Sequence, residues 1–275
     1  MGILSIFIGA SIAAAAPISA PAPVAQAPVQ PHPALWVVND HDTVVYLFGT
    51  FHALDGKSRW FEQAVKTAFF ASDELMLETI VPEPPRPPAP VSQWNGRPLV
   101  PTGDPVVTLA PSASSLLTTS KTVMKAGRTR GMSTDQGADA VLREAAEDMG
   151  KFVGGLESFE FQLRMFNSLA EAPKPVMEDA KAVGALSALL AELQAAWNRG
   201  DIDTFALMLG KMKAQSPDLY KTMFVERNAR WAQWIANRMK TPGTVFVAVG
   251  TGHLTGPDSV QSQLATLGVN SARIN

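Results

Sequence analysis

The segment VYLFGTFH (residues 45–52) runs from apolar and aromatic residues into a glycine that is followed three residues later by a histidine. The same pattern returns near the end of the chain, in VFVAVGTGH (residues 245–253). Apolar runs of this kind are typical of strands that are covered on both faces of a parallel sheet. The chain has only four histidines, so two of them in one local setting indicate related positions in the fold.

Ligands in open α/β sheets bind beyond the carboxyl ends of the strands. We expect Gly49 and Gly250 to adopt backbone angles that are closed to other residues, so that His52 and His253 leave the first turn on the ligand side. If the two strands are central neighbours, both imidazoles enter one crevice. The alternative is a pair of ordinary loop histidines, because a single G-x-x-H is a weak motif.

On either side of these segments, apolar runs alternate with segments whose apolar residues recur with helical periodicity. The pattern predicts an α/β fold with a mixed central sheet flanked by helices and a largely helical middle region. The predicted strands are residues 34–38, 43–48, 73–80, 151–157, 243–249 and 269–274. The predicted helices are residues 60–71, 113–126, 137–150, 158–170 and 257–267, with the region 174–240 almost wholly helical.

The amino-terminal region differs in composition from the rest, because the first charged residue is Asp40. Residues 1–16 are predicted to be a signal peptide: their apolar run is short for a membrane span, although no Lys or Arg precedes it. An uncleaved apolar tail or anchor is the alternative. Residues 17–33 read as a Pro/Ala-rich spacer. We expect a periplasmic or secreted protein with no stable membrane span after cleavage.

Residues 34–275 are expected to form a single domain that is interrupted by a Pro-rich loop at residues 81–105. The formal net charge of −2 and the lack of a basic run give no reason to expect nucleic acid as a partner. The chain contains no cysteine. Any metal ion must therefore be held by His, Asp and Glu.

Two glutamates stand at the ends of apolar strands: Glu78 in DELMLETI (73–80) and Glu157 in KFVGGLE (151–157). Burial of an unpaired carboxylate is strongly unfavourable, so each predicts a cation, a metal ion or a proton as its partner. The alternative is that these strand ends reach solvent. With His52 and His253 they form a His/Glu set that suits a divalent transition metal such as Mn, Co or Zn.

Arg227 lies on the apolar stripe of the helix that begins at Pro217, among Met223 and Trp231. A guanidinium in that position is expected to meet a carboxylate or an anionic substrate group, because it keeps its charge. A structural ion pair with Glu157 or Glu78 is the alternative. His41, in NDHD (39–42), is assigned to a hairpin turn.

Several segments together resemble the TraB/PrgY/GumN family, which is related to the Tiki metalloproteases. They are PALWVVNDHDTVVYLFGTFHAL (33–54), the end of the Glu78 strand, GLESFEFQ (155–162), ERNARWAQWI (226–235) and FVAVGTGHLTGPDSVQSQLATLGVNSARI (246–274). The Pro-rich segment after Glu78 departs from the family pattern.

The resemblance implies an EreA/ChaN/Tiki-like α/β fold and a metal-dependent hydrolase, most specifically a peptidase, that acts on a peptide or small-molecule substrate. It implies His52 and His253 as metal ligands, with Glu78 and Glu157 as a further ligand and the general base in an order that it does not fix. Arg227 would orient a carboxylate or bind developing negative charge.

Three glycines, Gly49, Gly250 and Gly252, are expected to shape the turns that carry these histidines. The rival interpretation is a non-catalytic accessory protein that binds a peptide or an envelope polymer.

Overall fold

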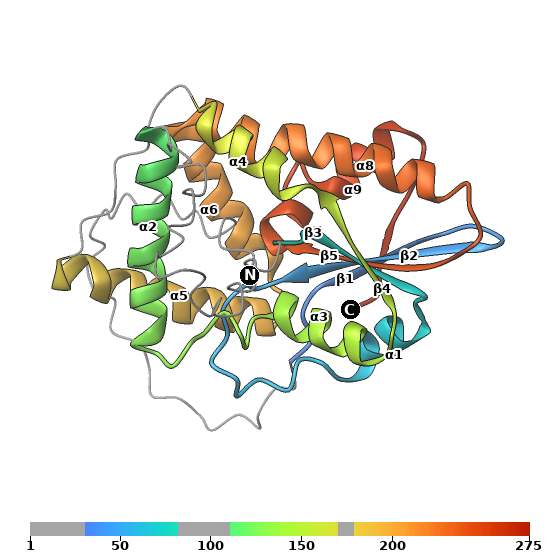
Figure 1. The fold of residues 1–275 in the computed structure, drawn as a ribbon, viewed down its shortest axis with the longest axis horizontal. Coiled ribbons are helices and arrows are strands. Elements are labelled where there is room, and N and C mark those ends of the chain that lie inside the picture. The colour runs from blue at the N-terminus through green and yellow to red at the C-terminus, as the bar shows by residue number, and fades with distance from the viewer. Residues whose placement is uncertain (1–30, 82–110, 170–178) are drawn as a thin grey trace, which may run out of the picture.

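A computed structural model describes residues 31–81, 111–169 and 179–275 of the chain, and Figure 1 shows its fold. The predicted signal peptide (1–16), the spacer up to residue 30 and all but the first residue of the predicted Pro-rich loop (81–105) lie outside the described residues.

The centre of the molecule is a six-stranded mixed sheet with the strand order β4-β3-β5-β2-β1-β6. The strands are β1 (Leu35–Asn39), β2 (Thr43–Thr50), β3 (Glu74–Thr79), β4 (Phe152–Glu157), β5 (Gly243–Gly250) and β6 (Ala272–Arg273). Strands β4, β3, β5 and β2 run parallel, and β1 is antiparallel to both of its neighbours. The expected α/β fold is confirmed, and β2 and β5 are central neighbours whose ends pair Thr50 with Gly250.

Helices cover both faces of this sheet (Figure 1). They are α1 (Gln63–Ala71) and α3 (Ala138–Asp148) on one side, and α8 (Glu226–Arg238) and α9 (Val260–Thr266) on the other. Strand β5 supplies side chains to both layers: Phe246 and Ala248 pack in one apolar cluster with α1 and α3, whereas Val245, Val247 and Val249 pack in a second with α8 and α9. Burial on both faces explains why the strand is apolar without alternation.

The helical middle region stands beside the carboxyl ends of the parallel strands (Figure 1). It comprises α2 (Pro111–Arg128), α4 (Phe159–Asn167), α5 (Ala180–Asn198), α6 (Ile202–Gln215), α7 (Pro217–Tyr220) and the π-helical turn η1 (Lys221–Val225), which leads into α8. Helix α6 packs against η2 (Thr251–Leu254), the 3₁₀ turn that follows β5 and contains His253. These helices therefore cover the carboxyl ends of the strands, where the predicted site residues lie.

Several predicted elements differ from the structure. Helix α1 starts at Gln63, whose φ of 48° interrupts the helical backbone, and not at residue 60. Helix α9 starts at Val260 and not at residue 257, because residues 255–259 form a turn and Ser259 caps the helix. Strand β6 has two residues. The helix from Pro217 contains the π-turn η1, a feature that is frequent at functional sites, immediately before the segment with Arg227.

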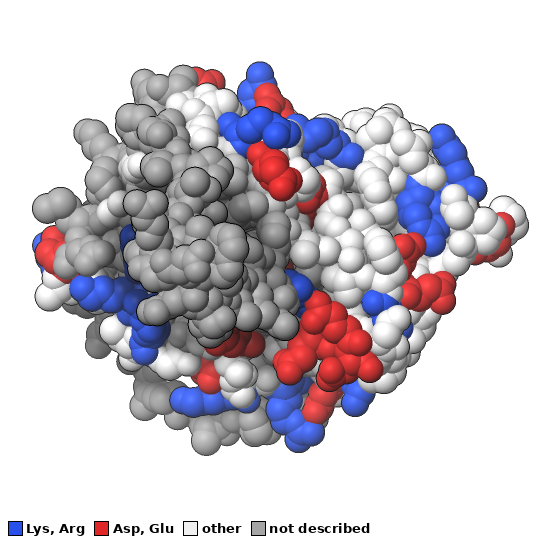
Figure 2. Space-filling model, in the orientation of Figure 1, with Lys and Arg blue, Asp and Glu red and all other residues white. Residues whose placement is uncertain are grey.

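The described surface mixes both signs of charge. Figure 2 shows Lys and Arg side chains beside Asp and Glu side chains on one face, and the described part of that face carries no continuous basic area. Over residues 31–81, 111–169 and 179–275, no helix is both long enough and apolar enough to cross a membrane.

Candidate functional site

The two G-x-x-H segments converge at the carboxyl ends of β2 and β5. A Cβ atom placed on Gly250 would lie 3.1 Å from His52 Nε2 and 3.1 Å from Glu78 Oε1. His253 Nε2 lies 3.7 Å from the same Glu78 oxygen. The structure thus brings His52, His253 and Glu78 together around Gly250, as the position of the two strands predicts.

The three glycines act by leaving space. The expectation that Gly49 and Gly250 adopt backbone angles closed to other residues is wrong: neither has a positive φ, and Gly250 has φ −52° and ψ 137°. A Cβ on Gly49 would lie 2.9 Å from Thr251 Oγ1, and one on Gly252 would lie 3.0 Å from a ring carbon of Phe224. The close approach of neighbouring atoms is what selects glycine at these turns.

Arg227 joins the acidic residues of the site. Its Nη2 donates to Glu78 Oε2 at 2.8 Å, and its Nε donates to the two oxygens of Glu157 at 2.9 and 3.1 Å. The third nitrogen, Nη1, lies 3.2 Å from His253 Nε2 and donates to the Met223 carbonyl oxygen at 3.3 Å. The side chain is only 1% exposed, so one buried cation compensates two buried carboxylates.

The two glutamates have different surroundings. Glu78 accepts a second hydrogen bond from the Gly250 N–H at 2.8 Å, on the side of the histidines. Glu157 is instead surrounded by donors, since Gln162 Nε2 and Arg230 Nη2 each approach its carboxylate to 3.3 Å. Glu78 is therefore the carboxylate next to the imidazoles, and Glu157 holds Arg227 from the other side.

His52 forms a half-buried pair with Asp139, which the sequence did not single out. His52 Nδ1 lies 2.6 Å from Asp139 Oδ2, and the His52 side chain is 11% exposed. Burial works against protonation of the ring, but Asp139, and to a lesser extent Glu78, outweigh it and raise the pKa of His52 to about 9.

The beginning of α3 positions Asp139. The Ala138 N–H donates to the Phe51 carbonyl oxygen at 3.0 Å. A Cβ on Gly137 would lie 2.2 Å from the His52 carbonyl oxygen, so only glycine permits this contact. An acidic residue in the first turn of a helix is common because it favours the helix dipole, which is why Asp139 carried no functional signal in the sequence.

His253 forms the corresponding pair with a neutral residue. Its Nδ1 lies 2.6 Å from Asn228 Oδ1, and Asn228 Nδ2 donates to the Asp258 carbonyl oxygen at 2.7 Å. The amide oxygen is thereby oriented to accept a hydrogen bond from the Nδ1 N–H, which leaves the Nε2 lone pair facing Arg227. Burial lowers the pKa of His253 to about 3: the attraction of Glu78 does not offset it, and the charge of Arg227 lowers the pKa further.

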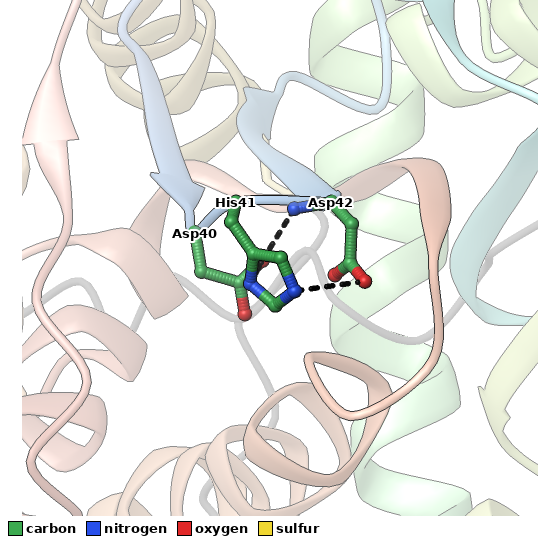
Figure 3. Close-up of side chains that lie close together, drawn as sticks. All are labelled: Asp40, His41 and Asp42. Carbon is green, nitrogen blue, oxygen red and sulfur yellow. Dashed lines mark hydrogen bonds and ion pairs between the residues drawn. The ribbon is translucent and has the colours of Figure 1, made fainter.

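Among the described residues, one group of three His, Asp or Glu side chains has its ligand atoms within 4.8 Å of one another, and it lies outside this site. It is the exposed turn Asp40–His41–Asp42 (Figure 3). Asp40 Oδ1 accepts from the backbone N–H groups of Asp42 and Thr43 at 3.2 and 2.9 Å, so these residues form the predicted hairpin turn between β1 and β2.

A cavity of about 320 Å³ opens directly beside the site. Its polar end is lined by His52, His253 and Arg227, and its walls come from the helical middle region. This volume lies within the range of small-molecule and peptide side-chain pockets.

No curated protein and no solved structure matches this sequence. A sequence model of the TraB/PrgY/gumN family matches residues 34–115 and 113–273, which contain both G-x-x-H segments, both glutamates and Arg227. Because the match extends over most of the chain, this protein belongs to the TraB/PrgY/gumN family.

Proposed function

We propose that this protein is a metal-dependent hydrolase that cleaves peptides at the site between β2 and β5. The observation that supports the proposal most directly is the shared arrangement of the two imidazoles. Each has its Nδ1 2.6 Å from a side-chain oxygen. Metal-binding histidines characteristically donate one ring N–H to such an oxygen and coordinate through the other nitrogen.

The donor set fits a divalent transition metal, Mn, Co or Zn, held by His52 Nε2, His253 Nε2 and Glu78. Bound there, the ion would supply Lewis acidity at the polar end of the cavity. Two features of the site must change before a metal ion can bind. The His253 Nε2 lone pair faces Arg227 Nη1 at 3.2 Å, so an ion must replace this contact, and His52 must lose its second ring proton.

The remaining residues have roles that follow from their contacts. Glu157 and Arg227 form the ion pair that orients Glu78 through Arg227 Nη2. Arg227 also places a positive charge 3.2 Å from His253 Nε2, where it would bind negative charge that develops on a substrate carbonyl oxygen. Glu78 is the carboxylate placed to take a proton from water or to bind the ion.

Cleavage assays on the parent protein and on three variants test the proposal. Purified protein loaded in turn with Mn, Co and Zn is incubated with a peptide library, and new termini are identified by mass spectrometry. We expect cleavage that a chelator abolishes and that Glu78→Gln reduces by about 10²-fold or more. Glu78→Gln that keeps the ion but loses turnover identifies Glu78 as the proton acceptor, and loss of both identifies it as a ligand.

His41→Ala is the matched control, because His41 lies in the exposed turn and is 86% exposed. Its cleavage rate should equal that of the parent protein. Cleavage that persists at the parental rate after loss of both His52 and His253 would refute the proposal.

A binding protein without catalytic activity is the second candidate. The observation in its favour is that Arg227 bonds to both glutamates, so the buried carboxylates are compensated by the protein's own cation. Turnover separates the two candidates: a binder saturates at one peptide per chain and releases it intact.

We further propose that the protein acts in the periplasm or outside the cell, on the basis of the predicted signal peptide at residues 1–16. Amino-terminal sequencing of the protein recovered from the periplasmic fraction tests this. A mature chain that begins after residue 16 is expected, and an intact amino terminus in the cytosolic fraction would contradict the proposal.

A further inference from the structure

The cavity beside the site is polar only in part. His52, His253 and Arg227 lie at one end, next to Gly250 and Gly252, and a second polar group comprises Arg128, the last residue of α2, and Asp135, in the segment that follows α2. Between them the walls are apolar. They include Val123, Met124, Leu190, Phe205, Met208 and Met223, contributed by α2, α5, α6 and η1.

Methionine is prominent in these walls, since Met132 also contributes to them. Its unbranched and polarisable side chain adapts to apolar groups of different shapes. A pocket with this lining offers few hydrogen-bond partners to a polar ligand. An apolar ligand, in contrast, is shielded from water there.

Gly127 keeps one wall open. It lies in α2, one residue before the end of that helix, and it is buried. A Cβ added there would meet Met132 Cβ at 3.5 Å and Leu190 Cδ1 at 3.7 Å, which are ordinary contact distances. Neither a positive φ nor a close approach requires glycine here, and glycine is an unfavourable residue within a helix. Gly127 is itself one of the residues that line the cavity, so a larger side chain at this position would take up part of the cavity volume.

We propose that the site takes substrates with a large aliphatic or aromatic group next to the bond that is cleaved, and that Gly127 sets the size of the group accepted. This inference rests on the proposed hydrolysis. In that reaction water is added across a peptide C–N bond: its oxygen bonds to the carbonyl carbon, and the leaving nitrogen receives a proton. The apolar side chain of the residue at the bond occupies the cavity, while its carbonyl lies at the polar end.

A binding experiment tests the pocket without catalysis. The probe is N-phenyl-1-naphthylamine, a neutral apolar fluorophore that brightens on transfer from water. We expect one probe per chain, and about tenfold or greater weakening in Gly127→Leu, whose side chain would occupy part of the cavity that Gly127 lines. Gly184→Leu is the matched control, because Gly184 is also helical but has no atom within 4 Å of an added Cβ. Circular dichroism verifies that both variants are folded.

A cleavage experiment tests the size rule. In the peptide library, Leu, Met, Phe or Trp should be enriched at one position adjoining the cut, and Gly127→Leu should shift this enrichment to Ala and Ser.

The two proposals fail in different ways. Cleavage without a preference for large apolar residues, or probe binding that Gly127→Leu leaves unchanged, would overturn the pocket inference and leave hydrolysis standing. Probe binding that depends on Gly127, with no cleavage under any metal, would overturn the proposed hydrolysis.

Discussion

The segments 49–52 and 250–253 have the same local sequence pattern and the same place in the fold, but their histidines have opposite chemistry. His52 is paired with a carboxylate and has its pKa raised to about 9, whereas His253 is paired with an amide and has its pKa lowered to about 3. The partners come from different elements, Asp139 from α3 and Asn228 from α8. The strand ends therefore fix where each imidazole lies, and the helices fix which protons it carries.

Arg227 makes the asymmetry sharper, because it contacts His253 and not His52. Arg227→Met should lower the free energy of unfolding by about 3–5 kcal/mol, since it leaves two buried carboxylates without their cation. Urea unfolding measures the loss. Arg230→Met is the control: Arg230 is 45% exposed and also bonds to Glu157, so its loss should cost about 1 kcal/mol or less. Equal losses of unfolding free energy in the two variants would contradict the assignment of Arg227 as the cation that compensates both buried carboxylates.

The His52 segment depends on the contact with the beginning of α3. Gly137→Ala should destabilise the fold by about 1–3 kcal/mol, because the new Cβ would overlap a backbone oxygen that cannot move away easily. Gly210→Ala, at a helical position with open space around it, should stabilise the protein by about 0.5–1 kcal/mol. Thermal unfolding of both variants measures the difference. Stabilisation by Gly137→Ala would show that Gly137 is not in close contact with the His52 carbonyl oxygen.

The side-chain oxygens that pair with the two imidazoles are both expected to increase the affinity for the metal ion. Asp139→Ala and Asn228→Ala are each expected to weaken the affinity for the preferred metal by about 10–100-fold, because they release the ring orientation. Isothermal titration with Mn, Co and Zn measures this. An unchanged affinity in both variants would show that these hydrogen bonds do not contribute to metal binding.

The charge difference between the partners can be removed by Asp139→Asn in metal-free protein. The pKa of His52 should fall from about 9 towards or below its ordinary value of 6.5, as measured by NMR. A raised folded-state pKa stabilises the fold fully below the unfolded value, and this contribution is lost as the pH rises through the folded value. Asp139→Asn should therefore destabilise the protein more at pH 6 than at pH 10. A pH-independent effect would contradict the assigned ion pair.

The strands and most helices were predictable from the sequence because their burial leaves a periodic signal. Apolar runs located β2 and β5, and the glutamates that end β3 and β4 stood out against apolar neighbours. The pairing of Arg227 with both glutamates was predictable only as one of two alternatives, because sequence distance does not show which strand ends meet.

The role of the glycines and the histidine partners was not predictable in the same way. Gly49 and Gly250 suggested special backbone angles, but a close approach to Thr251, Glu78 and His52 is what excludes a side chain there. Asp139 occupies an ordinary position in the first turn of a helix, and Asn228 follows Arg227 directly in the sequence. Their contacts with the imidazoles join segments that are more than twenty residues apart in the sequence.

The metal content of the protein tests the proposed site most directly. Protein purified without a chelator, and then incubated with Mn, Co or Zn and freed of unbound ion, is analysed by inductively coupled plasma mass spectrometry beside His52→Ala/His253→Ala. We expect close to one transition-metal ion per chain in the parent protein and none in the double variant. Equal metal content in the two proteins, or no ion in either after incubation, would contradict metal binding by the paired histidines.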